Sequence, residues 1–229
     1  MLQVFLYRLV SKSDFDAFYQ DIKLKLPKAL LSKIENFKYS ADKQRSLIGH
    51  LIVRWFYAKE LKIDPFRLEF DYNEHKKPFL KSYPKAHFNI SHSGDFVLVA
   101  FSDCQVGVDI EKNKGNRLKV AKRFFTQEEL DDLFAISAEK QQIDYFYQLW
   151  TLKESYMKAI GKGISMSLNS FSFKKYYTDF RLRYSKEDMG FQFTAYTPHP
   201  EYACALCSKY ISKPKLEELS ISTLADLFK

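Results

Sequence analysis

The spacing of apolar and polar residues along the chain predicts short strands interrupted by two long helices. Alternating or continuous apolar runs favour strands at residues 2–9, 68–72, 88–91, 96–102, 105–112, 170–174, 180–184, 191–196 and 202–208. Apolar residues at helical spacing predict helices starting at Ser13, Pro27 and Thr126, two long helices over 41–61 and 146–163, and a terminal helix within 216–229. Helices with a small sheet in each half make an α+β pattern.

Turn and cap signals place several of these elements. The segment HSGD (92–95) separates two apolar runs, which predicts a β-hairpin whose turn contains Gly94. Thr126 followed by Glu129 is a capping-box pattern at the start of a helix. Ser40 is expected to cap the 41–61 helix, and Arg45 then lies near the helix end whose dipole favours anions.

Composition limits the classes of partner. The 229 residues include 36 basic and 28 acidic ones, and the net charge of +8 favours an anionic partner such as nucleic acid, an acidic protein or a phosphorylated ligand. We find no RNP-like aromatic motif, and we therefore expect no nucleic acid. A signal peptide and a bilayer-length apolar run are both missing, so we expect a cytoplasmic protein without a membrane partner.

The cysteines indicate neither a disulfide framework nor a zinc site. They number three, Cys104, Cys204 and Cys207, and an odd count does not fit a disulfide framework. The CxxC spacing of Cys204 and Cys207 falls within a predicted strand, with no second pair and no nearby histidine. We therefore expect a structural role for both.

The helix predicted over 146–163 has an apolar stripe next to a stripe of aromatic and charged residues. The apolar stripe consists of Leu149, Leu152, Tyr156 and Ile160. Trp150, Glu154 and Lys158 follow one another four residues apart on the neighbouring stripe. Glu154 and Lys158 suit either an ordinary surface ion pair or a site where the carboxylate binds a metal and the lysine binds a phosphate.

The segment VGVDIEK (106–112) places two acids on one face of a strand. Asp109 and Glu111 are two residues apart, so their side chains leave the same face. Oxygen ligands without His or Cys suit Mg²⁺, with Mn²⁺ as the alternative ion, and Glu154 would supply a third carboxylate if its helix packs over this strand. The alternative is an exposed edge strand with ordinary surface acids.

Two further segments offer partners for phosphate. Ser91 and His92 are expected in or beside the hairpin turn, where hydroxyls, backbone N–H groups and an imidazole can bind an anion. Lys76, Lys77 and Pro78 place two cations in a polar loop. Each segment alone also fits a hydrogen-bonded turn or a solvated loop. Together with the acids they indicate binding of a di- or polyphosphate through Mg²⁺.

Four segments resemble the 4′-phosphopantetheinyl transferases of the surfactin-synthetase-activating (Sfp) type: FNISHSG, GVDIE, KRFFTQEEL and FYQLWTLKESYMKAIGKGIS. The resemblance covers roughly residues 26–210 and is most specific at 107–111 and 150–163. It implies two similar α/β halves related by pseudo-twofold symmetry, each with a small, mainly antiparallel sheet and a long helix. The halves would be residues 1–103 and 104–229, with coenzyme A in the cleft between them, and a monomer would suffice.

The resemblance also implies an activity and a set of roles. A Mg²⁺-dependent enzyme would move the 4′-phosphopantetheine arm of coenzyme A to a serine of an acyl or peptidyl carrier protein, and would release adenosine 3′,5′-bisphosphate. Asp109, Glu111 and Glu154 would hold the metal. Glu154, with a water, would accept the serine proton, and Lys158 would stabilise or protonate the leaving group. The coenzyme A contacts would be Lys33, Arg45, Lys76, Lys77, Pro78, Ser91, His92, Asp109, Lys153 and Lys158.

One position departs from the pattern of this family, and two other functions are alternatives to the transferase. Leu30 stands where a second lysine is expected beside Lys33, and Lys28 is the candidate to replace it. Acidic carrier proteins suit the +8 charge, and Phe124, Phe125 and Leu130 are the expected docking surface. The alternatives are another Mg²⁺-dependent enzyme acting on a nucleotide, such as a pyrophosphate hydrolase, and a non-catalytic module that binds carrier proteins or RNA.

Overall fold

The computed structural model describes residues 1–177, 179–185, 190–210 and 212–228. Its helices are α1 (Lys12–Ile22), α2 (Lys28–Glu35), α3 (Ser40–Leu61), α4 (Leu118–Phe124), α5 (Gln127–Phe134), α6 (Glu139–Ile160) and α7 (Ile221–Ala225). Its strands are β1 (Leu2–Arg8), β2 (Phe70–Tyr72), β3 (Pro78–Leu80), β4 (His87–Ser93), β5 (Phe96–Ser102), β6 (Val106–Lys112), β7 (Ser172–Tyr176), β8 (Asp179–Tyr184), β9 (Gln192–Tyr196), β10 (Tyr202–Ser208) and β11 (Leu216–Leu219).

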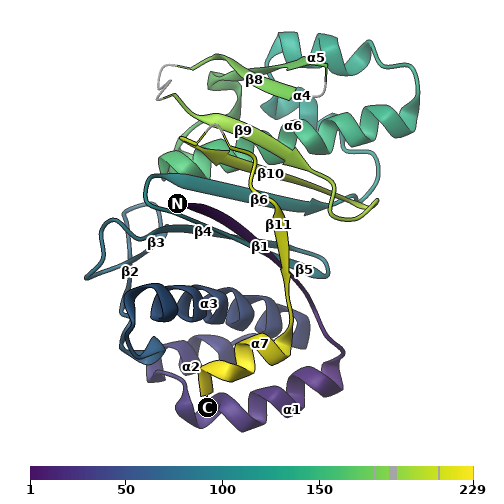
Figure 1. The fold of residues 1–229 in the computed structure, drawn as a ribbon. Coiled ribbons are helices and arrows are strands. Elements are labelled where there is room, and N and C mark those ends of the chain that lie inside the picture. Colours follow the sequence, from purple (N-terminus) through teal and green to yellow (C-terminus); the bar gives the residue numbers. More distant parts are fainter. Residues whose placement is uncertain (178, 186–189, 211, 229) are drawn as a thin grey trace.

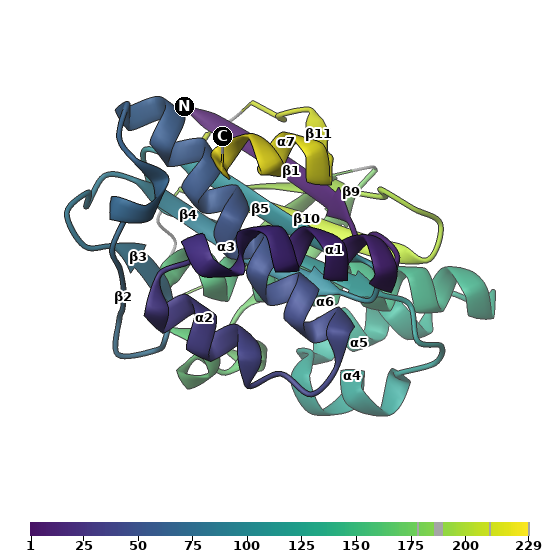
Figure 2. The ribbon, with the colours of Figure 1, turned by 90° about the horizontal axis from the view of Figure 1, so that it is seen from below.

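Two sheets lie face to face between two groups of helices (Figure 1). The first sheet has the order β11-β1-β5-β4, and the second has the order β6-β10-β9. All pairs in these sheets are antiparallel except β1 with β11. Figure 2 shows α1, α2 and α3 lying across the outer side of the first sheet. The predicted α+β class with two halves, each with a long helix and a small, mainly antiparallel sheet, is confirmed.

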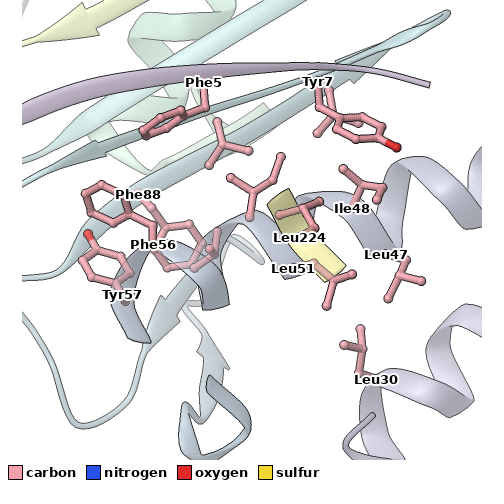
Figure 3. Packing of buried hydrophobic residues seen from close by; sticks show 14 of the residues in the cluster. Phe5, Tyr7, Leu30, Leu47, Ile48, Leu51, Phe56, Tyr57, Phe88 and Leu224 are labelled. Atoms are coloured by element: carbon pink, nitrogen blue, oxygen red, sulfur yellow. The ribbon is translucent and has the colours of Figure 1, made fainter. Parts of the chain in front are cut away.

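The alternation of side chains in the first sheet explains this layering. On β1, Val4 and Leu6 point between the two sheets, whereas Phe5 and Tyr7 point toward the helices. Figure 3 shows Phe5 and Tyr7 above α3, where the buried side chains of that helix complete the first core. Because both faces are apolar, the strand is covered on both sides.

The helix α6 closes the second half. Its predicted apolar stripe is confirmed for Leu149, Leu152 and Tyr156, which are all fully buried against the second sheet. The helix starts at Glu139, earlier than the expected residue 146, and ends at Ile160. Gly161 adopts φ 81° as the left-handed C-cap, a conformation that glycine tolerates without a Cβ clash, so the helix stops three residues before Gly163.

Some local expectations need correction. The hairpin of β4 and β5 is confirmed, but β4 continues to Ser93 and only Gly94 and Asp95 form the turn, so Ser91 and His92 are strand residues. Ser11, not Ser13, caps α1 by accepting from the Asp14 N–H. The capping box of Thr126 and Glu129 is confirmed. The N-cap of α3 is Tyr39 without a side-chain hydrogen bond, so Ser40 does not cap that helix.

The C-terminal segment differs most from the prediction. Residues 216–219 form β11, which pairs in parallel with β1, and only the following residues are helical. Leu224 of α7 is buried in the first core, as Figure 3 shows. The expectation of a terminal helix is therefore correct only for its second part. No helix within the described ranges is both long and apolar enough to cross a membrane.

Candidate active site

A close approach between β6 and α6 creates the candidate site. A Cβ atom at Gly107 would collide with the backbone carbonyl oxygen of Ser155 and the backbone nitrogen of Ala159. Glycine at this position therefore lets the helix backbone lie directly on the strand. Glu154 and Lys158 directly precede the two contact residues in sequence, and their side chains point toward the acids of β6. The expectation that this helix packs over this strand is confirmed.

A cavity of about 300 Å³ opens where β4, β6 and α6 meet. It is lined by Ile90, Ser91, His92, Asp109, Glu111, Trp150, Glu154 and Lys158. Six of these residues were predicted as site residues from sequence. Trp150 was placed only on the same helix stripe as Glu154 and Lys158, and Ile90 carried no chemical signal.

Asp109 is the centre of the hydrogen-bond network in this cavity. Its side chain is buried, and its Oδ1 accepts from Lys158 Nζ at 2.6 Å and from Ser91 Oγ at 2.8 Å. Lys158 Nζ also lies 3.0 Å from Ser91 Oγ. Asp109 Oδ2 is buried without a hydrogen-bond partner among the described residues. One oxygen of the carboxylate is thus fixed, and the other is available to a ligand.

The three carboxylates of this cavity repel one another when they are ionised. Burial raises the pKa of Glu154 to about 7, and the charges of Asp109 and Glu111 add to the rise while Lys158 opposes it. Burial and the charge of Asp109 also raise the pKa of Glu111, although the hydrogen bond from Ser93 opposes this rise. A bound cation would relieve the repulsion among these groups.

The donor chemistry of the cavity fits a hard divalent cation. Asp109, Glu111 and Glu154 supply only oxygen ligands, and one buried oxygen of Asp109 lacks a partner. Within the described ranges, however, no three acid, histidine or cysteine side chains are grouped as a ready-made metal site. The fit therefore rests on the oxygen donors of the three carboxylates.

Lys153 lies outside this cavity, so its expected role in ligand binding is corrected. Its side chain is 0% exposed, and Nζ lies 2.8 Å from Glu129 Oε2, which is equally buried. The ammonium also donates to the carbonyl oxygens of Leu168 at 2.8 Å and Phe171 at 2.7 Å. All three donors are used, so Lys153 joins α6 to α5 and to the segment that follows α6.

In the loop before β3, the ammonium of Lys77 is bonded within the protein. Lys77 Nζ donates to the carbonyl oxygens of Val106 at 3.2 Å, Lys158 at 2.5 Å and Ala159 at 3.3 Å. Burial lowers the pKa of Lys77 to about 8. The ammonium therefore satisfies carbonyls of β6 and of the C-terminal end of α6, and Lys77 lines a separate cavity together with Pro78 instead of the acidic one. The neighbouring Lys76 is exposed, with φ 63°.

The remaining predicted residues are not among those that line the acidic cavity. Pro78 lines a separate cavity of about 260 Å³. Lys33 lines a third cavity of about 580 Å³, where Nζ lies 3.1 Å from His50 Nε2. Arg45 donates to the carbonyl of Gly94 at 2.5 Å, which ties α3 to the hairpin turn beside the site.

The three residues of the expected docking surface differ in exposure, and so do two residues of α2 near Lys33 in sequence. Phe125 is only 4% exposed, so this part of the expected docking surface is wrong, whereas Phe124 and Leu130 are half-buried. Leu30, which replaces the expected basic residue, is buried and lines the same cavity as Lys33. Lys28 is the first residue of α2 and is not among the residues that line this cavity.

Family models match nearly the whole chain in two parts. The model described as 4′-phosphopantetheinyl transferase superfamily matches residues 105–207. The model described as 4′-phosphopantetheinyl transferase, N-terminal, matches residues 12–104. The two matched regions meet between β5 and β6.

Relatives of known name match the same regions. The 4′-phosphopantetheinyl transferase Sfp of Bacillus subtilis (strain 168) is 44% identical over 140 residues, which cover 61% of this chain and 62% of that protein. The chain thus spans less than two thirds of the length of this relative. The 4′-phosphopantetheinyl transferase gsp of Aneurinibacillus migulanus is 37% identical over 191 residues, which cover 82% of this chain and 78% of that protein.

A solved structure of low similarity covers less than half of this chain. The holo-(acyl-carrier-protein) synthase from Bacillus anthracis str. Ames, in complex with CoA (3′,5′-ADP), is 20% identical, with a TM-score of 0.40, over 45% of this chain and 92% of that chain. The sequence matches, with 78% of the gsp protein covered at 37% identity, are the decisive ones. The chain belongs to the 4′-phosphopantetheinyl transferase superfamily and is similar to its Sfp-type members.

Proposed function

We propose that this protein transfers the 4′-phosphopantetheine arm of coenzyme A to a serine of an acyl or peptidyl carrier protein. The observation that carries the proposal is the single cavity in which Asp109, Glu111, Glu154 and Lys158 meet, in a chain of this family. A group of acids beside a lysine suits a diphosphate held with a divalent cation. Coenzyme A has such a diphosphate between its pantetheine arm and its adenosine.

Asp109, Glu111 and Glu154 would hold Mg²⁺, with Mn²⁺ as the alternative ion. The ion would supply charge neutralisation to the diphosphate. Ser91 and His92 line the same cavity, and we propose that they bind the phosphate oxygens. Lys158 lies within hydrogen-bond distance of Asp109 and Ser91, which supports a role for its ammonium in stabilising negative charge on the diphosphate.

The transfer step needs one base and one cation from the chain. The serine oxygen of the carrier would attack the phosphorus that bears pantetheine, and the bond from this phosphorus to the bridging oxygen would break. Glu154, acting through a water that it orients, would accept the serine proton, because a carboxylate that also binds a cation is a weak base by itself. Lys158 would stabilise or protonate the departing adenosine 3′,5′-bisphosphate.

The test is a transfer assay with an apo carrier protein, coenzyme A and Mg²⁺. We expect the carrier to gain the mass of one phosphopantetheine arm and an equal amount of adenosine 3′,5′-bisphosphate to appear. Release of the bisphosphate without modification of the carrier would instead favour a hydrolase that acts on a pyrophosphate. An unmodified carrier and intact coenzyme A would count against both enzymes.

We further propose acidic carrier proteins as partners, a monomeric state and a location in the cytoplasm. The net charge of +8 supports docking to an acidic surface. The three cysteines are free thiols, which fits a reducing compartment. If docking is electrostatic, the second-order rate constant with an acidic carrier will fall steeply as the salt concentration rises.

A further inference from the structure

The two halves meet along a seam, which we define as the side chains of Asn89, Ser91 and Ser93 on β4. The strands β4 and β6 belong to different sheets and stand at the edges of those sheets. Alternate side chains of β4 accept hydrogen bonds from alternate backbone N–H groups of β6. These bonds run from Val108 to Asn89 (2.8 Å), from Ile110 to Ser91 (3.3 Å) and from Lys112 to Ser93 (3.0 Å). The seam thus satisfies donors that an edge strand would otherwise leave open.

The two serines of the seam also contact the acids of the cavity. Ser91 Oγ donates to Asp109 Oδ1 at 2.8 Å, and Ser93 Oγ donates to Glu111 Oε2 at 2.9 Å. A hydroxyl can accept one bond and donate another, so each serine joins the halves and orients a carboxylate at the same time. Asn89 faces the part of β6 where Gly107 has no side chain, so its seam bond involves no acid.

Glu111 depends on this contact more than Asp109 does. Asp109 has Lys158 Nζ at 2.6 Å, whereas no basic group in the described part of the chain lies within 4.0 Å of the Glu111 carboxylate. Glu111 also has one more rotatable bond than Asp109. The hydrogen bond from Ser93 therefore selects the orientation of the Glu111 carboxylate among several rotamers.

We propose that Ser93 is a positioning residue that holds Glu111 toward the cation and diphosphate. This inference depends on the proposed function, because the cation is the ligand that Glu111 would bind there. It assigns two tasks to one residue: Ser93 joins the halves by accepting from the Lys112 N–H, and it prepares the ion site by donating to Glu111. Neither task is visible in the motif GVDIE, since Ser93 lies on the other half.

Ser93→Ala and Asn89→Ala make a matched pair for the test. Each removes one acceptor from the seam, but only Ser93→Ala also releases an acid. We expect Ser93→Ala to weaken Mn²⁺ binding about tenfold, the lower end of the range for the loss of a second partner of a metal ligand. Mn²⁺ would be titrated into the protein with coenzyme A present and followed by electron paramagnetic resonance. The Mg²⁺ concentration for half-maximal transfer should rise by the same factor.

Asn89→Ala should bind Mn²⁺ within about threefold of the wild type, and Ser93→Thr, which keeps the hydroxyl, should restore most of the affinity. Circular dichroism checks that each variant is folded. If Ser93→Ala does not fold, Ser93→Cys keeps the size of the side chain and weakens the donor. Equal Mn²⁺ affinity in the wild type and Ser93→Ala, or an equal loss in Asn89→Ala, would overturn the inference. A wild-type protein that leaves the carrier unmodified would instead refute the proposed function.

Discussion

The buried pair of Lys153 and Glu129 gives the sharpest test of which lysine of α6 serves the site. Both side chains are 0% exposed, and their charged atoms lie 2.8 Å apart. Lys153→Met keeps an unbranched side chain of similar length but removes the ammonium. It leaves the Glu129 carboxylate charged and buried, and it removes the donor of two further carbonyl oxygens.

The expected cost follows from this burial. Removal of one partner from a buried ion pair costs about 3–5 kcal/mol of unfolding free energy. A domain of this size typically has about 5–15 kcal/mol in total. The midpoint of thermal unfolding should therefore fall by about 6–20 °C, at about 2–4 °C per kcal/mol. Glu129→Gln in the same chain should recover part of this loss, because it removes the unpaired charge and can retain the bond from the backbone N–H of Phe173.

Urea unfolding followed by tryptophan fluorescence would measure the loss, and the transfer assay at low temperature would measure the activity of the folded fraction. Lys153→Met should keep the KM for coenzyme A within about twofold, because its ammonium faces the core. Lys158→Met is the matched control on the same helix: it should lose activity with a smaller loss of stability. Unchanged stability of Lys153→Met with a raised KM for coenzyme A would refute this reasoning.

Three further outcomes follow from the site and its surroundings. Glu154→Gln should lower kcat by about 10²-fold or more without a change in circular dichroism, because a neutral amide cannot accept the serine proton, and full activity would exclude this role. Gly107→Ala should cost about 3 kcal/mol in urea unfolding, because its Cβ would push α6 off β6, and wild-type stability would contradict that contact. Burial lowers the pKa of His50 to about 3, with Lys33 and Arg54 adding to the effect. The stabilising contribution of neutral His50 should therefore be complete above its ordinary pKa of 6.5 and should be lost as the pH falls toward 3. Urea unfolding of the wild type and His50→Phe between pH 7 and 4 should show that only the wild type loses this contribution. Parallel curves of unfolding free energy against pH would contradict it.

Local patterns predicted the chemistry of the site better than its surroundings. The two-residue spacing of Asp109 and Glu111 fixes their common face on any strand, and the four-residue spacing of Glu154 and Lys158 fixes theirs on any helix. Those four residues do meet in one cavity. The directions of these side chains depend only on local backbone geometry, whereas the close packing of α6 on β6 at Gly107 brings the two pairs together.

The predictions were wrong where the direction of a side chain does not decide which groups of the protein lie opposite it. Lys153 is adjacent in sequence to Glu154 but lies about 100° away around the helix. Its burial depends on Glu129 and on the segment after α6, neither of which its own helix reveals. Likewise, the cationic loop at Lys77 gave no sign that its ammonium would satisfy the carbonyls of α6. The strand character of residues 216–219 depends on the free edge of β1.

The sequence by itself determined the strand that carries Asp109 and Glu111, the helix that carries Glu154 and Lys158, and the family resemblance. These depend on short-range periodicity and on motifs whose spacing is read directly along the chain. Only the tertiary structure decided which lysine of α6 lines the cavity and which lysines satisfy buried groups, and it alone joined Ser93 to Glu111 across the two halves. Such contacts bring together segments far apart in sequence, and their energies depend on burial, which no local pattern specifies.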